Sequence, residues 1–318
     1  MEPIFLKPAF QEKIWGGNKL STEFHLDIPS EHTGEAWVIS AHPNGLSYVK
    51  SPAKYQGQSL SRLYEEVPQI FGPHHPEPFP LLVKILDARE DLSIQVHPND
   101  DYAKEHEGPE ELGKTECWYV ISADEGASIV YGHHAKTVEE FKEYIHTGNL
   151  TNVFREIPVK AGDFFDVPAG TIHAIGGGIT ILETQQSSDT TYRVYDFDRI
   201  DDEGKLRELH LNQVEDVTLF PHRDSPYTNQ ALILEKNQLV KLMSNEYFNV
   251  YKVEVDSQVD VPLELNYYLA TVIDGEGLLV VDEKSYDLPL AESFILPYGT
   301  ESMTLKGNFS LIISSPNY

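Results

Sequence analysis

Four side chains in three short segments of the chain could together bind a metal ion. Gln95 and His97 lie two residues apart in the segment IQVHP. Residues two apart on a strand point to the same face, so both side chains can reach one point. Glu116 opens the segment ECWYV, and His173 follows a Pro-x-Gly turn. Two imidazoles, a carboxylate and an amide oxygen suit zinc or a similar divalent ion, which can act as a Lewis acid.

A plainer interpretation is that His97 and His173 are ordinary, partly buried histidines. The joint pattern favours a metal site, because Glu116 lies between them in a strand order typical of a barrel. The adjacent pairs His74–His75 and His133–His134 lie in loop-like segments. Adjacent strand residues face opposite ways, so we expect these two pairs to face solvent.

Basic residues are scarce, so those in apolar surroundings are informative. Lys84 lies within the apolar segment PLLVKIL, where a lysine is unusual. It could line the inside of a barrel, or it could be an edge-strand lysine that limits aggregation. Lys114 lies two residues before Glu116 and would share its face. Glu183 alternates with Ile181, so it is either an inward-pointing acid or an exposed one.

Arg193 lies in the segment TYRVYDFDR, which is rich in tyrosine. It could serve a site for an anion, or it could form a structural ion pair with Asp196 or Asp198. An anionic substrate would need such local positive charge, because the chain has a net charge of −27.

Bulk properties exclude several classes of function. The strong negative charge argues against a nucleic-acid partner, because binding to backbone phosphates requires Lys and Arg. The sequence contains no run of eighteen apolar residues, so no membrane span is expected. Residues 1–10 do not resemble a secretory signal. The single cysteine, Cys117, cannot form an intrachain disulfide, so a cytoplasmic protein is expected. Nothing in the sequence specifies an oligomeric state.

The sequence predicts a mostly β protein, because runs of β-branched and aromatic residues alternate with Gly, Pro, Asn and Asp. The expected strands are 80–87, 92–97, 116–122, 127–131, 163–167, 179–184, 268–273 and 278–282. A few short helices are expected at 59–67, 99–111 and 137–147, the last with Thr137 and Glu140 as a capping box.

A weak internal repeat organises these elements. Residues 116–173 contain a strand, a turn, another strand and a Pro168-x-Gly170 turn, and residues 267–302 repeat this order around Pro297-x-Gly299. The repeat predicts two jelly-roll barrels, with a linker at 221–230. We expect a catalytic domain at 1–228, into which the short helices are inserted, and a second barrel at 229–318. Ser302 takes the place of His173 in the second copy, so that barrel should bind no metal.

The residues 162–173 resemble the second cupin motif, with Gly177 where many cupins have Asn. In the first cupin motif Gln95 replaces the first histidine, and Glu116 comes later than usual. With this alteration the chain resembles the type I phosphomannose isomerases, in their short bacterial form. The resemblance extends over five segments in order, GEAWVIS, FPLLVKILDA, SIQVHPND, GKTECWYV and ETQQSSDTTYRVYDFDR, which span residues 34–199.

The resemblance implies a cupin fold and the interconversion of mannose 6-phosphate and fructose 6-phosphate. It also implies one zinc ion per chain, and it assigns the family's site residues to the metal ligands Gln95, His97, Glu116 and His173, the catalytic arginine Arg193, the pocket lysines Lys84 and Lys114, and the pocket acids Glu35 and Glu183.

Isomerisation of this kind moves a proton between C2 and C1 through a cis-enediol(ate). Glu183 is one candidate for the base, and a water or hydroxide on the metal is another. Lys84, Lys114 and Arg193 would divide two tasks, holding the phosphate and stabilising the enediolate. The alternatives are an iron-dependent cupin oxygenase, a non-enzymatic sugar-binding cupin, and an isomerase of another sugar phosphate.

Overall fold

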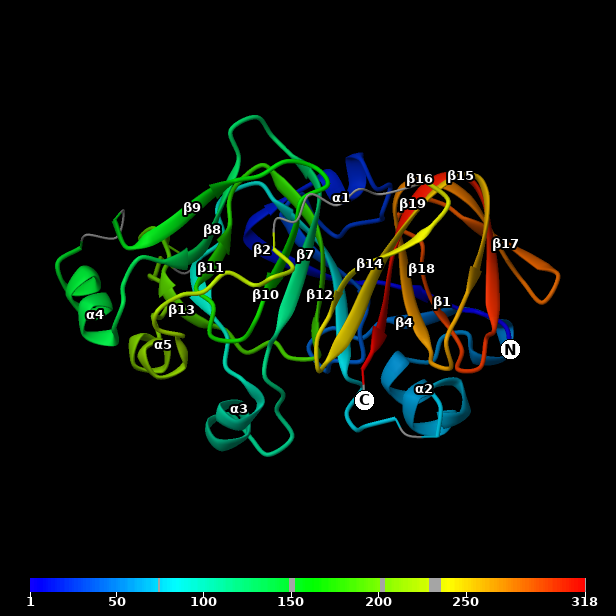
Figure 1. The fold of residues 1–318 in the computed structure, drawn as a ribbon, viewed down its shortest axis with the longest axis horizontal. Helices are drawn as coiled ribbons and strands as arrows, with labels where there is room; N and C mark the ends of the chain where they lie inside the picture. Colours follow the sequence, from blue (N-terminus) through cyan, green and yellow to red (C-terminus); the bar gives the residue numbers. More distant parts are fainter. Residues whose placement is uncertain (74, 149–151, 201–203, 229–235, 318) are drawn as a thin grey trace.

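The computed structural model describes residues 1–73, 75–148, 152–200, 204–228 and 236–317. The chain is mostly β, and its strands form three sheets (Figure 1). The six-stranded sheet contains, in spatial order, β10 (Phe164–Val167), β7 (Glu116–Ala123), β12 (Ile179–Gln186), β5 (Leu81–Ala88), β2 (Ala9–Gly17) and β3 (Thr33–Ile39). The five-stranded sheet contains β13 (Tyr192–Tyr195), β6 (Ile94–Val96), β11 (His173–Ile175), β8 (Ser128–His133) and β9 (Phe154–Pro158).

These two sheets form the first barrel, because their inner faces share one apolar core. Leu86, Trp118 and Ile181 contribute from the six-stranded sheet, and Ile129 and Ile175 from the five-stranded sheet. Within the six-stranded sheet, β5 and β12 are buried along their whole length, whereas most of β2 is half-buried. This explains why a lysine and an acid on these two strands must find partners inside the protein.

The remaining eight strands form the second barrel, which lies beside the first (Figure 1). They are β14 (Leu239–Ser244), β15 (Phe248–Pro262), β19 (Ser302–Pro316), β16 (Tyr268–Val281), β18 (Ser293–Leu296), β1 (Ile4–Lys7) and β4 (Tyr48–Ser51) in spatial order, with β17 (Lys284–Leu288) beside β16. Apolar side chains such as Val253, Leu305 and Phe294 fill its interior. Two strands from the start of the chain therefore complete the barrel formed by its end.

One expected pair of strands is a single element. Residues 268–273 and 278–282 were expected as two strands with a turn between them, but β16 runs through both. The segment Asp274-Gly275-Glu276-Gly277 pairs with β19, after a register shift between Val272 and Asp274. Gly275 has φ of +70°, and a Cβ on Gly277 would lie 2.3 Å from the Phe309 ring. The glycines thus allow a bend and a close approach within a strand, where the sequence indicated a turn.

The helices are short and occur before residue 218 in the described residues: α1 (Lys19–Thr22), α2 (Leu60–Glu66), α3 (Asp100–His106), α4 (Val138–His146), α5 (Leu211–Val217), and 3₁₀ turns at Ala53–Tyr55 and Pro68–Ile70. Ser59, Asn99 and Thr137 cap the N-termini of α2, α3 and α4 through side-chain oxygens. Each cap agrees with a helix expected from sequence. Within the described residues, none of the helices combines the length and the apolar character that crossing a membrane requires.

The Pro-x-Gly turns of the two barrels have the same geometry. Gly170 and Gly299 have φ of +85° and +81°, and in each turn the residue after the glycine donates to the proline carbonyl at 3.1 Å. His173 opens β11 and Ser302 opens β19, each three residues after its glycine. The internal repeat is therefore a structural equivalence, with a histidine in one copy and a serine in the other.

Candidate metal centre and its cavity

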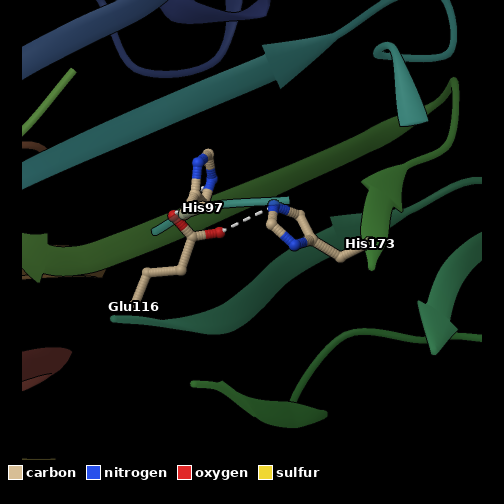
Figure 2. Close-up of side chains that lie close together, drawn as sticks. All are labelled: His97, Glu116 and His173. Atoms are coloured by element: carbon tan, nitrogen blue, oxygen red, sulfur yellow. Dashed lines mark ion pairs between the residues drawn. The ribbon is translucent and has the colours of Figure 1, made fainter. Parts of the chain in front are cut away.

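His97, Glu116 and His173 meet between the two sheets of the first barrel (Figure 2). Glu116 opens β7 on one sheet, His173 opens β11 on the other, and His97 directly follows β6. All three side chains are buried, and one potential ligand atom from each lies within 4.8 Å of the others. The side chains converge because β6 and β11 are neighbours in one sheet and the start of β7 approaches their ends from the other sheet.

Both histidines direct Nε2 toward Glu116. His97 Nδ1 donates to the Thr190 carbonyl at 2.9 Å, and His173 Nδ1 donates to the Thr171 carbonyl at 2.8 Å. These bonds fix the tautomer in which Nε2 carries a lone pair, as in metal-binding histidines generally. Burial lowers the pKa of His173 to about 4 and lowers that of His97 well below its usual value. Both rings are therefore neutral near pH 7, the form that binds a cation.

The donor atoms are spaced as a divalent metal requires. Nε2 of His97 lies 3.4 Å from Glu116 Oε2, and Nε2 of His173 lies 3.3 Å from Glu116 Oε1. Bonds of about 2.0–2.1 Å in a tetrahedral zinc site separate neighbouring donors by about 3.3 Å. His97 Nε2 and Glu116 Oε2 are buried and have no hydrogen-bond partner among the described residues. Buried polar atoms are rarely left unpaired, so these residues fit a cation.

Gln95 reaches the edge of the same cluster. It pairs with His173 in register, and its Nε2 lies 3.3 Å from His173 Nε2. Turning the amide about its last bond would place Oε1 on this side, since the two ends of an amide are nearly the same shape. Gln95 is therefore close enough to be a fourth ligand, and that role stays a prediction.

Beside the cluster, Lys84 lies between two buried carboxylates. Its Nζ is 3.3 Å from Glu183 Oε1 and 3.9 Å from Glu35 Oε2. Burial alone would lower the pKa of Lys84, but Glu183 and Glu35 raise it above its usual value. Lys84 is thus a cation inside the barrel and not on an edge strand, because β5 lies between β12 and β2.

The pKa values of the two carboxylates beside Lys84 are shifted in opposite directions. Burial and the charge of Glu116 raise the pKa of Glu183. Burial also opposes ionisation of Glu35, but Lys84, Lys13 and a hydrogen bond from Trp37 lower its pKa to about 2. Paired acids whose pKa values are pushed apart are typical of proton-transfer sites. Glu183 is the one suited to exchange a proton, while Glu35 stays ionised.

These groups line a cavity of about 440 Å³ that is mostly polar. Its walls include all but one of the site residues expected from sequence, namely Glu35, Lys84, Gln95, Lys114, Glu116, His173, Glu183 and Arg193. The exception is His97, which is buried behind the wall and contacts Glu116. Lys114 Nζ lies 3.4 Å from Glu116 Oε2. A small polar molecule entering this space would meet the candidate metal ligands, the acids and the cations together.

Arg193 does not pair with Asp196 among the described residues. Its Nη1 donates to the Glu208 carbonyl at 2.7 Å, and its Nε is buried without a hydrogen-bond partner there. Asp196 instead binds Arg199 and Arg207. The guanidinium of Arg193 therefore keeps donors for a molecule in the cavity.

Several cavity residues were not expected from sequence: Lys13, Trp118 as a hydrogen-bond donor, Asp189, Arg207 and His210. Lys13 lies 3.3 Å from Glu35, and its place in KIWGG gave only the weak signal of a charge next to an apolar residue. Arg207 and His210 reach the cavity on the segment that follows β13. Long connections of this kind carry no periodicity from which such contacts can be predicted.

One expectation about histidines was wrong. His133 was expected to face solvent with His134, but it is buried and its ring contacts Phe141 and Phe220. Its Nε2 donates to the Leu219 carbonyl at 3.0 Å. His134 is exposed and His75 is half-buried, while His74 lies outside the described residues. The segment after α5 packs over His133 through Leu219 and Phe220. The residue pattern of a strand does not predict which distant segment will pack over it.

Comparisons with known proteins all indicate one family. The family described as phosphomannose isomerase type I, catalytic domain, matches residues 4–150, and the mannose-6-phosphate isomerase cupin domain matches residues 238–316. The chain is 51% identical to a mannose-6-phosphate isomerase of Streptococcus mutans, with 99% of both chains covered. It is 46% identical to the mannose-6-phosphate isomerase ManA of Bacillus subtilis, with 98% of both covered.

Solved structures show the same fold. The crystal structure of the mannose 6-phosphate isomerase from Bacillus subtilis superposes with a TM-score of 0.94 at 44% identity, covering 99% of both chains. A putative mannosephosphate isomerase from Archaeoglobus fulgidus shares the fold at 20% identity, with a TM-score of 0.79 over 99% of both chains.

Proposed function

This chain belongs to the type I phosphomannose isomerase family, and we propose that it interconverts mannose 6-phosphate and fructose 6-phosphate with one zinc ion per chain. One observation carries the proposal: the group of candidate metal ligands adjoins a cavity that also contains Glu183, a buried acid whose pKa is raised. A sugar isomerase needs a proton-transferring group beside a centre that accepts negative charge, and this cavity contains both.

His97, Glu116 and His173 would hold the ion, with Gln95 as the fourth ligand. The ion would supply Lewis acidity to the sugar oxygen on which charge develops. The bonds from the two histidines to the Thr190 and Thr171 carbonyls keep Nε2 directed into the site. The protein therefore orients these ligands before any ion binds.

Glu183 is the proposed base. Its Oε1 takes the proton from C2 of the open-chain aldose, and the electrons of that C–H bond form the C1–C2 double bond as charge moves to O1. The result is the cis-enediol(ate). Glu183 then returns the proton to C1, the proton of the O2 hydroxyl passes to O1, and O2 becomes the ketone oxygen, which gives the ketose. Lys84, 3.3 Å from Oε1, stabilises the ionised carboxylate that must accept the proton.

Three cations divide the work of binding the anionic substrate. The contact of Lys84 with Glu183 supports a place for it beside the reacting carbons. Arg193, without a carboxylate partner among the described residues, can direct N–H donors at the enediolate. Lys114, which contacts Glu116, is the third cation. Whichever of the three does not stabilise the enediolate would bind the substrate phosphate.

The test is a steady-state assay of the zinc-loaded protein on a small panel of aldose phosphates, coupled to ketose phosphate detection, with metal counted by elemental analysis. We expect turnover of mannose 6-phosphate above the other substrates and a metal content of about one per chain. Preference for a different aldose phosphate would keep the reaction type and change the substrate. A metal content of two per chain would contradict the metal-free second barrel, in which Ser302 stands where His173 stands in the first.

A further inference from the structure

Trp118 contacts both the candidate metal site and the candidate base. It lies on β7, directly opposite Glu183 on β12 and two residues after Glu116. Its indole Nε1 donates to Glu116 Oε1 and to Glu183 Oε2, at 3.1 Å in both cases. Its ring also packs edge-on against His173, with 5.3 Å between ring centroids. One side chain thus contacts two candidate metal ligands and the candidate base.

An indole is well suited to this position. It offers a single N–H donor, accepts no hydrogen bond and carries no charge near pH 7. Trp118 is 1% exposed, so water cannot replace its bond to either carboxylate. A lysine here would neutralise one acid, whereas the indole orients both and leaves their charges in place.

The bond also selects which oxygen of Glu183 is available. Trp118 holds Oε2, while Oε1 faces Lys84 and has no hydrogen-bond partner among the described residues. Oε1 is therefore the oxygen left to exchange a proton. Because one N–H serves both acids, a displacement of either carboxylate changes the hydrogen bond that the other receives.

We propose that Trp118 is a positioning residue that orients the metal ligand Glu116 and the base Glu183 through one shared hydrogen bond. The part about the base rests on the proposed isomerase reaction, whereas the part about the metal ligand rests only on the proposed metal site. Loss of the donor should weaken zinc binding and slow turnover, and substrate binding should change less, because Trp118 acts through the two acids.

The test uses Trp118→Phe, which keeps an aromatic ring and removes the N–H. We expect the zinc dissociation constant, measured by competition with a chromogenic chelator, to rise about 10- to 100-fold. At saturating zinc we expect kcat to fall by about tenfold or more, with KM changed by less than about threefold. Zinc affinity within about twofold of the wild type, or kcat within about twofold at saturating zinc, would overturn the proposal.

Trp37→Phe is the matched control. It removes an equally buried indole N–H from a carboxylate, since Trp37 Nε1 donates to Glu35 Oε2 at 2.5 Å, but Glu35 is not a proposed ligand. Its zinc affinity should equal that of the wild type. Equal weakening of zinc binding in both variants would indicate a general packing effect and overturn the proposal.

A second measurement applies if Trp118→Phe does not fold. The chain has three tryptophans, so ¹⁵N-indole spectra of the wild type contain three signals, and Trp15→Phe and Trp37→Phe assign them. The Trp118 signal should move when zinc is added and when Glu183→Gln is introduced. An unmoved Trp118 signal in both cases would refute the shared bond. A wild type without isomerase activity would refute the proposed function, yet the zinc and indole results would still decide the role of Trp118.

Discussion

Asp196 binds Arg207 through two hydrogen bonds, from Nε to Oδ2 at 2.6 Å and from Nη2 to Oδ1 at 2.5 Å. Arg199 donates to the same carboxylate. Burial would raise the pKa of Asp196, but these hydrogen bonds from the two arginines hold it below its usual value. The structural ion pair that sequence allowed for Arg193 is therefore formed by other arginines.

This arrangement makes Arg193→Ala a test of catalysis. Loss of one well-placed donor to a developing negative charge costs on the order of 10²–10³ in kcat, and we expect at least about that loss. Arg193→Lys should recover only part of it, because lysine keeps the charge but not the planar donor geometry. The measurement is steady-state kinetics on mannose 6-phosphate, with melting temperature and zinc content as checks on folding.

Arg155→Ala is the control for that experiment, because Arg155 pairs with Asp224 outside the cavity. It should keep the wild-type kcat. A near-normal kcat for Arg193→Ala would remove Arg193 from the chemistry.

Metal removal should abolish activity, and zinc should restore it. His97→Ala and His173→Ala should each weaken zinc binding by well over about tenfold, since each removes a proposed ligand and not merely a neighbour of one. His134→Ala serves as the control, because that side chain is exposed. Elemental analysis after dialysis against a chelator gives the result. Stripped protein that turns over at the full rate would refute metal dependence.

Lys84→Met should destabilise the fold as well as slow the reaction. The substitution leaves Glu183 and Glu35 buried beside an apolar side chain, and removing one partner of a buried pair costs about 3–5 kcal/mol. Adding Glu183→Gln to Lys84→Met should recover part of that free energy of unfolding, because one stranded charge disappears. Urea denaturation of the single and double variants measures both values. Additive losses in the double variant would mean that Lys84 and Glu183 are not coupled.

Asp166 should make stability depend on pH. Burial raises its pKa to about 6, although Ser225 donates to it at 2.5 Å. An unfolded Asp titrates near 3.9, so between these values the folded state binds more protons, and stability falls as pH rises. Relative to Asp166→Asn, the wild type should lose about 2 kcal/mol of unfolding free energy between pH 4 and pH 7.

Denaturant unfolding at several pH values checks this, with Glu125→Gln, an exposed turn residue, treated identically. The free energy of unfolding of the wild type should change with pH as it does in the Glu125→Gln variant, and it should differ from that of Asp166→Asn. A difference that grows in favour of the wild type as pH rises would reverse the expected sign and contradict the assignment.

Local patterns in the sequence were sufficient for much of the fold and the cavity. Runs of β-branched and aromatic residues predicted β5, β7 and β12, and helical spacing with capping residues predicted the three capped helices, because those signals act over a few residues. The meeting of His97, Glu116 and His173 followed from strand order in a repeated barrel. Cys117, the single cysteine, is free and buried in the core.

What sequence did not reveal depends on contacts far apart in the chain. Ile4 on β1 pairs with Ile295 on β18, and no local pattern encodes that partner. Arg207 enters the cavity because of how the segment after β13 folds back. The bend in β16 looked like a turn, because Asp-Gly-Glu-Gly has turn composition and only pairing with β19 keeps it extended. We propose a domain boundary near residue 228 in the sequence only. In space, β1 and β4 precede that boundary in the chain but belong to the second barrel.

The pairing of β1 with β18 also constrains the order of events during synthesis. The ribosome adds about 5–20 residues per second, so β1 waits roughly 15–60 seconds for its partner strand to emerge. During that time Ile4, Phe5 and Leu6, all buried in the finished protein, have no second barrel to cover them. Until β18 is made, an uncovered apolar strand of this kind can associate with other chains, so completion of the second barrel also removes a site of aggregation.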